Sequence, residues 1–228
     1  MRLVIFDIDG TLTQTTKADE ECFVRSLAEV CGFGEVDTDW SHYKHATDSG
    51  ILQEIYEAHA GRPPSSAEVS RFRQHFVGLL AQVSSEAAFA AVTGAPLVLS
   101  RLADSAAHRV ALATGGWRDA ARLKMTSAGL SYDAYPAASS DDALDRESII
   151  RLSMQRAAER YGLAARFTLA TVSGTLVRAV TWAFHLSELR RTVARHAYPP
   201  RARFACSPIS ATRILFLTFC IGWRLRRE

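Results

Sequence analysis

The chain has little of what would indicate a zinc site, a disulfide framework or a membrane span. Its four cysteines, Cys22, Cys31, Cys206 and Cys220, show no tight paired spacing, so neither a zinc site nor a disulfide framework is expected. The apolar run 214–223 is about half the length that a bilayer requires. No basic segment followed by an apolar stretch opens the sequence, so we expect no signal peptide and a cytoplasmic protein with reduced thiols.

Two residue types are missing from the carboxyl-terminal quarter. Residues 170–228 contain 10 Arg and two Glu, a net charge of +8, with neither Lys nor Asp. Residues 1–169 contain 17 Lys+Arg and 22 Asp+Glu, a net charge of −5. Because Lys and Asp are common on globular surfaces, this stretch is unusual. It is either a basic tail for nucleic acid or a membrane surface, or it is not an evolved sequence.

The rest of the composition is that of an ordinary globular protein. Hydrophobic residues make up 48% of the chain and charged residues 22%. The length of 228 residues fits one domain, or a core with a smaller insertion.

Residues 4–11 are the most informative stretch. An apolar run ends at two aspartates, Asp7 and Asp9, followed by Gly10. A strand here would place both aspartates on one face at its carboxyl end, where open α/β sheets build their sites. Two carboxylates this close repel, so the pair indicates a cation between them or a proton on one. The chemistry that fits is magnesium-assisted attack by a carboxylate on a phosphate.

The string from Phe6 to Thr13 resembles the first motif of the haloacid dehalogenase-like phosphatases. The resemblance implies that Asp7 is the nucleophile, which forms an aspartyl-phosphate. Asp9 would be the general acid for the leaving oxygen and then the base that activates water. The Asp7 carboxylate and the Asp9 backbone carbonyl would hold Mg²⁺, and Thr11 would help to set the phosphate-binding loop.

The segment that follows is expected to be helical. Apolar and charged residues alternate at helical spacing from about residue 17 to 80, with breaks at Gly32, Gly34 and the Pro63–Pro64 turn. Many members of the family carry a cap at this place. We therefore expect a core at 1–14 and 85–168, a helical cap at 15–84 and an aberrant tail at 169–228. His45, Thr47 and Asp48 could touch the substrate, although we favour their being surface loop residues.

A second phosphate-binding element is expected near residue 114. Residues 109–114 predict a buried strand, followed by Gly115, Gly116 and a helix that begins at 117. A hydroxyl beside glycine N–H groups and a helix N-terminus suits a phosphate oxygen, although an N-cap threonine has the same pattern. The position resembles the second family motif, so Thr114 and Gly115 are candidate phosphate ligands.

The third family motif is a Lys or Arg at the start of a helix, which neutralises the nucleophile and the phosphate. Arg146 precedes the amphipathic helix predicted for 148–161 and is the candidate. Lys124 is the second choice.

The fourth motif, a strand ending in Gly-Asp-x-x-x-Asp, is absent, because no Asp follows Asp145. Codons compatible with residues 170–178 nevertheless admit Gly-Asp-Gly-Val-Trp-Asp-Ala-Arg in a neighbouring frame. Two further segments, 180–189 and 206–214, also re-read as family-like sequence in that frame. We therefore hypothesise a frameshift near residues 167–170, most simply a short deletion, after which too few residues remain for the fourth strand.

The sequence thus predicts an α/β protein whose Rossmann-like parallel sheet carries a helical cap after its first strand, with later core strands missing or disrupted. The expected function is that of a Mg²⁺-dependent phosphatase of small phosphorylated metabolites, resembling phosphoglycolate phosphatase-like members and impaired in this chain. The alternatives are a phosphomutase of the same family, or an inactive protein whose basic tail binds nucleic acid or a membrane. The main interpretation expects neither of these two partners, and a monomer or homodimer.

Overall fold

A parallel sheet of four strands forms the centre of the structure, in the order β3-β2-β1-β4. The computed structural model describes residues 2–162 and 168–172, the latter by their backbone, and all of them lie within the compact unit Met1–Leu186. The strands are β1 (Arg2–Phe6), β2 (His108–Ala113), β3 (Ala137–Ala138) and β4 (Thr168–Val172). Val4 of β1 pairs with Val110 on one side and with Ala170 on the other.

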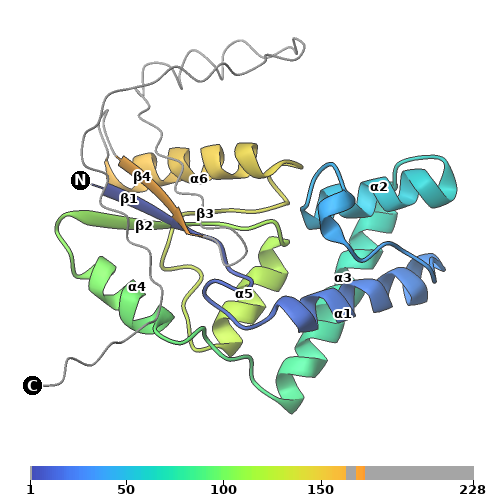
Figure 1. Cartoon of the computed structure of the whole chain (residues 1–228), viewed down its shortest axis with the longest axis horizontal. Coiled ribbons are helices and arrows are strands. Elements are labelled where there is room, and N and C mark those ends of the chain that lie inside the picture. The colour runs from blue at the N-terminus through green and yellow to red at the C-terminus, as the bar shows by residue number, and fades with distance from the viewer. Residues whose placement is uncertain (1, 163–167, 173–228) are drawn as a thin grey trace, which may run out of the picture. The chain divides into compact units, whose positions relative to one another are not determined.

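Helices cover both faces of the sheet (Figure 1). On one face, α6 (Arg146–Tyr161) packs Ile149, Met154 and Ala157 against Leu3 and Ile5 of β1. On the other face, α4 (Ala95–Ala103) and α5 (Arg118–Ser127) pack against the alternate strand residues. The buried side chains of this second layer include Phe6, Val110, Leu112, Leu99, Ala121 and Met125. This burial on both faces explains why the strands are nearly continuous apolar runs.

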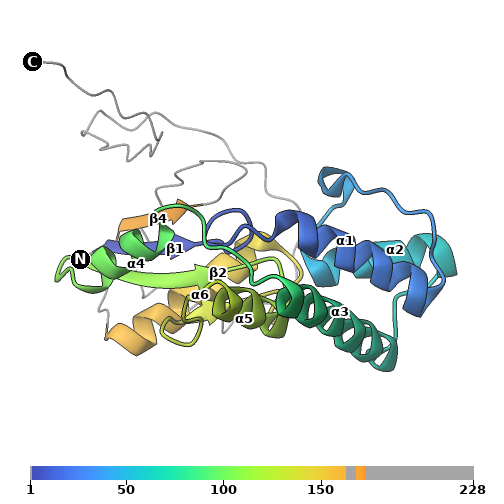
Figure 2. The same cartoon turned by 90° about the horizontal axis from the view of Figure 1, so that it is seen from below.

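A helical region, residues 16–86, follows the first strand and its loop. It consists of α1 (Thr16–Ser26), a π-helical turn η1 (Leu27–Cys31), a 3₁₀ turn η2 (Trp40–His42), α2 (Asp48–Ala60) and α3 (Ser66–Glu86). Figure 2 shows α1 and α3 side by side beyond the end of the sheet. Its aromatic cluster joins Phe23, Phe72 and Phe76 to Trp117, which directly precedes α5.

Much of this architecture agrees with the prediction, with two differences. Strand β1 ends at Phe6, so Asp7 and Asp9 lie on the following loop rather than on one face of a strand. Gly10 makes the turn in that loop with a φ of 70°. Strand β4 forms at 168–172 and pairs with β1, at a place where too few residues were expected to remain for the fourth strand.

The other predictions for the tail concern residues outside the described part of the chain. Cys22 and Cys31, the two described cysteines, are both free thiols. Among the described residues, no helix is both long and apolar enough for a transmembrane segment.

Candidate active site

Asp7 lies directly after β1, with 15% of its side chain exposed. Its Oδ1 accepts the backbone N–H of Ile8 at 2.9 Å. Its Oδ2 lies 3.5 Å from Nη1 of Arg146. Burial raises the pKa of Asp7, and the positive charge of Arg146 opposes that rise. Asp7 is therefore a largely buried carboxyl group whose Oδ2 faces the guanidinium of Arg146.

Asp9 points to a different cation. Its Oδ2 accepts a hydrogen bond from Nζ of Lys124 at 2.7 Å, and its Oδ1 accepts one from the Thr15 hydroxyl at 2.5 Å. Both carboxylate oxygens are thus held by fixed donors.

Lys124 has no exposed side-chain surface and binds a second carboxylate, Asp19 of α1, also at 2.7 Å. Burial by itself would lower the pKa of Lys124, but the surrounding carboxylates, Asp19 foremost, raise it above its ordinary value. Burial raises the pKa of Asp19, and the charge of Lys124 counteracts that shift. This lysine is therefore a buried ammonium ion within a group of acids.

Several groups of the loop between β2 and α5 are held by hydrogen bonds within the protein. The Thr114 hydroxyl accepts the N–H of Gly116 at 3.1 Å, which leaves its own proton able to reach another acceptor. The N–H of Trp117 donates to Oδ2 of Asp48 at 2.9 Å, and the N–H of Asp48 donates to the Gly115 carbonyl at 2.8 Å. Asp48 thus joins the start of α2 to this loop, and burial raises its pKa to about 8.

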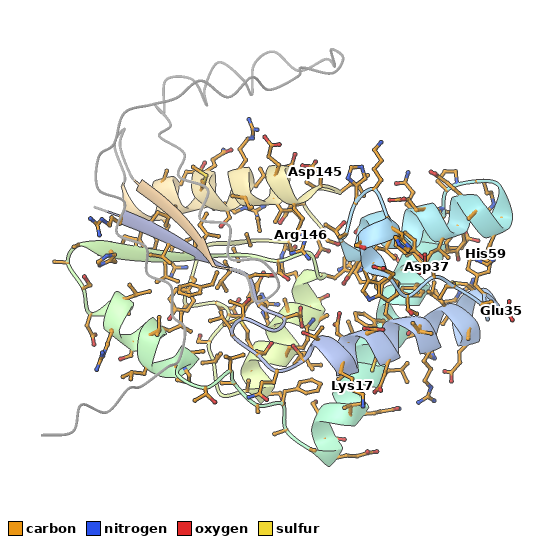
Figure 3. All side chains as sticks on the ribbon, viewed as in Figure 1. Lys17, Glu35, Asp37, His59, Asp145 and Arg146 are labelled. Atoms are coloured by element: carbon orange, nitrogen blue, oxygen red, sulfur yellow. The ribbon has the colours of Figure 1, made fainter. Side chains whose placement is uncertain are left out.

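Arg146 begins α6 at the side of the core that faces the helical region (Figure 3). Its Nε donates to the Ala46 carbonyl at 2.9 Å while Nη1 faces Asp7. The guanidinium also lies over Gly115, where a Cβ would be 2.5 Å from its central carbon. Arg146 therefore connects Asp7, the loop after β2 and the segment before α2.

The predicted residues come together in part. Asp7, Gly115 and Arg146 share one site, and Thr114 lies beside Gly115. The backbone N–H of Thr11 donates to the Ile8 carbonyl at 3.1 Å, within the loop that carries Asp7 and Asp9. Asp9 instead belongs with Lys124.

Two features escaped the sequence analysis. Thr15 and Asp19 contact Asp9 and Lys124, and their spacing of one helical turn was an available signal. Thr47 and Asp48 are 1% and 8% exposed, so the interpretation of these two as surface loop residues is wrong. Thr47 donates to the Leu144 carbonyl at 2.6 Å. His45 is half-buried, and its backbone N–H donates a hydrogen bond to the Glu54 carboxylate at 3.1 Å.

The donors at this site fit magnesium only in part. The Asp7 carboxylate and the Asp9 backbone carbonyl are the hard oxygen ligands that Mg²⁺ prefers. Within the described residues, no three His, Cys, Asp or Glu side chains form a group that could hold a metal ion.

Comparisons with known proteins support the fold. No protein-family model matches the sequence, and no curated protein matches it. A hydrolase from Pseudomonas syringae has a similar structure, with a TM-score of 0.58, 16% identity and 76% of each chain covered. CbbY from Rhodobacter sphaeroides, solved in complex with phosphate, gives a TM-score of 0.52 and 17% identity over 76% of this chain and 88% of that one.

A predicted phosphoglycolate phosphatase from Haemophilus somnus 129PT gives a TM-score of 0.50 and 13% identity over 75% of this chain and 76% of that one. The chain therefore shares the fold of these three proteins, in agreement with the α/β fold that the sequence predicts.

Proposed function

We propose that this chain derives from a Mg²⁺-dependent phosphatase of small phosphorylated metabolites and that its own activity is severely impaired. One observation carries the proposal. Asp7, a carboxylate at the carboxyl end of the central strand, lies 3.5 Å from an arginine that also covers the glycine loop after the neighbouring strand. A nucleophile, a cation and a loop of backbone N–H groups are what phosphoryl transfer to a carboxylate requires. The fold similarity to a protein solved with phosphate agrees with it.

In the proposed reaction, an oxygen of Asp7 attacks the phosphorus atom while the bond to the leaving oxygen breaks. Asp9 gives a proton to that oxygen, which leaves as an alcohol. Asp9 then removes a proton from water, which attacks the aspartyl-phosphate and releases inorganic phosphate. The Thr114 hydroxyl, the Gly115 N–H and Arg146 bind the phosphate oxygens, and the Thr11 loop holds the two aspartates in place.

Magnesium, held by the Asp7 carboxylate and the Asp9 backbone carbonyl, would neutralise the charges of the phosphate and the nucleophile. The charge of the site favours such an ion. Among the described residues, the cations in contact with Asp7, Asp9 and Asp19 are Lys124 and Arg146. When all three carboxyl groups are ionised, the group is one positive charge short of neutrality.

The proposed impairment follows from the missing acidic ligands. The end of β4 lies beside the end of β1, since Val172 pairs with Phe6. Acids just after β4 would be near Asp7, but residues 160–187 contain neither Asp nor Glu. A frameshift in the underlying gene accounts for their loss. Sequencing of the genomic locus tests this cause, because an uninterrupted frame with clean coverage through codons 160–185 contradicts it.

The function is tested by comparing this chain with a frame-restored version on a panel of phosphorylated metabolites and on p-nitrophenyl phosphate. We expect the restored protein to hydrolyse at least one substrate in a Mg²⁺-dependent manner, and its Asp7→Asn variant to be inactive. This chain should show little or no hydrolysis. A folded but inactive restored protein argues against a phosphatase, and full activity of this chain argues against the impairment.

The same assay separates the two alternative functions. A phosphomutase would move the phosphoryl group to another hydroxyl of a sugar phosphate and release little inorganic phosphate. A binding protein with a basic tail would be retained on DNA or acidic liposomes in a salt-sensitive manner. The tail residues 173–228 lie outside the described part of the chain.

A further inference from the structure

Lys124 is the most deeply buried cation of the described structure that the proposed reaction does not use. It has no exposed side-chain surface, and it binds Asp9 and Asp19 at 2.7 Å each. Asp9 belongs to the loop after β1, whereas Asp19 belongs to α1 of the helical region. The ammonium ion therefore joins the core to the helical region at one point.

A third acid lies close to the same point. A Cβ on Gly116 would be 3.6 Å from both Oδ2 of Asp48 and Nζ of Lys124. Asp48 is the first residue of α2 and is 8% exposed. Helices α1 and α2 thus each bring a carboxyl group to the buried ammonium. Without that ammonium, the cost of burying these acids would rise steeply.

Both oxygens of Asp9 are connected to the beginning of α1. Oδ1 accepts the hydroxyl of Thr15, the N-cap residue of α1. Oδ2 accepts Nζ of Lys124, which also binds Asp19 in the first turn of that helix. The carboxylate cannot turn without breaking a contact that depends on where α1 lies.

We propose that Lys124 is a positioning residue that fixes the Asp9 carboxylate and makes its position depend on the docking of α1 against the core. When α1 is docked, Thr15 and the Lys124–Asp19 pair hold the two oxygens of Asp9 in one orientation. When α1 moves away, Asp19 leaves Lys124 and Thr15 leaves Asp9, so the carboxylate is free to turn. The proposal rests on the proposed acid–base role of Asp9, but its test uses no hydrolysis and so is distinct from the test of that function.

The test is a double-mutant cycle on the full chain with Lys124→Met, Asp19→Asn and the two together. Arg122→Met is the matched control, because Arg122 lies on the same helix but pairs with Asp133 at the surface. Amide hydrogen exchange of residues 16–26 reports the docking of α1. The ¹³C resonance of the Asp9 carboxyl group at pH 7, assigned with Asp9→Asn, reports its surroundings.

We expect Lys124→Met to accelerate exchange in α1 at least about tenfold, because it leaves buried acids without their cation. Adding Asp19→Asn should recover much of that protection, because the double variant has one fewer unpaired acid. The Asp9 resonance should remain displaced in the double variant, which a purely structural role of Lys124 would not produce. Arg122→Met should change neither the exchange of α1 nor the Asp9 resonance. Combined with Asp19→Asn, it should therefore give the same result as Asp19→Asn alone.

If Lys124→Met alone fails to fold, the test still gives a result, since the double variant with Asp19→Asn should then fold. The proposal is overturned if the double variant is as damaged as Lys124→Met. It is equally overturned if Lys124→Met resembles Arg122→Met in α1 exchange and in the Asp9 resonance.

Discussion

The guanidinium of Arg146 lies directly over Gly115, so that a Cβ at residue 115 would be 2.5 to 2.8 Å from three of its atoms. A side chain at position 115 is therefore incompatible with the observed place of Arg146. Because Arg146 also faces Asp7, the glycine keeps open the space in which the guanidinium and the Asp7 carboxylate meet.

Gly115→Ala should displace Arg146 while changing the free energy of unfolding by about 1 kcal/mol or less, because the methyl group strikes the end of a flexible side chain. In the frame-restored protein, the affinity for inorganic phosphate should fall about tenfold or more, as expected on loss of a charged hydrogen bond. Calorimetric titration measures this fall. Gly78→Ala in α3 is the control, since a Cβ there meets nothing within 4 Å, and it should leave affinity unchanged and slightly stabilise the helix. Equal affinity of the two variants would contradict the role assigned to Gly115.

Asp142 should make the stability of the fold sensitive to acid. Its carboxylate accepts two hydrogen bonds from Arg156 at 2.8 Å each, and this pairing lowers the pKa of Asp142. Because the pKa of Asp142 is lower in the folded state than its unfolded value of about 3.9, the ionised carboxylate stabilises the fold above about pH 3.9. This stabilisation is lost as the pH falls through the folded-state pKa. Asp142→Asn should cost about 1–2 kcal/mol at pH 7 and flatten the loss of stability below pH 4. Urea denaturation at several pH values measures both effects, and the exposed Asp104→Asn should show neither.

Helix α3 begins with a reciprocal cap. The Ser65 hydroxyl accepts the N–H of Glu68 at 3.3 Å, and the Glu68 carboxylate accepts the N–H of Ser65 at 2.7 Å. Ser65→Ala should destabilise the protein by about 1 kcal/mol, because a helix N–H loses its partner. Ser66→Ala, one residue later, should have little effect. Thermal unfolding of the pair tests the cap, and indistinguishable melting temperatures would refute its contribution.

The aromatic cluster should be the main source of stability in the helical region. Phe72 is fully buried and packs edge-on against Phe23 at 5.0 Å and Trp117 at 5.8 Å between ring centroids. Phe72→Ala should cost about 3–5 kcal/mol through lost burial and a cavity. Val83→Ala, at a site that is 38% exposed, should cost about 0.5 kcal/mol or less. A small effect at Phe72, seen in denaturant unfolding, would show that the cluster contributes little.

Local patterns were good predictors where one signal dominated. The apolar run before Asp7 and the amphipathic repeat after residue 145 predicted β1 and α6, since burial on a sheet dictates both patterns. The same signals could not show that Asp9 binds Lys124, because that contact joins residues 115 positions apart. They also could not show that Asp48 is buried, since its surroundings are supplied by the Trp117 loop. Strand β4 was not expected because residues 168–172 precede no recognisable family motif. The sequence alone could not show that they pair with β1.

The pairing of β1 also determines when the sheet can be completed during synthesis. Arg2 pairs with His108 on one side and with Thr168 on the other, so both neighbours of the first strand are made long after it. The contacts within the helical region join residues much closer in sequence, such as Phe72 and Phe76. Local contacts form sooner than distant ones, because less chain entropy is lost in closing the loop. On the ribosome, the helices can therefore associate while β1 has no partner. β1 can pair on one side only after residues 108–113 have emerged, and on the other side only after residue 172.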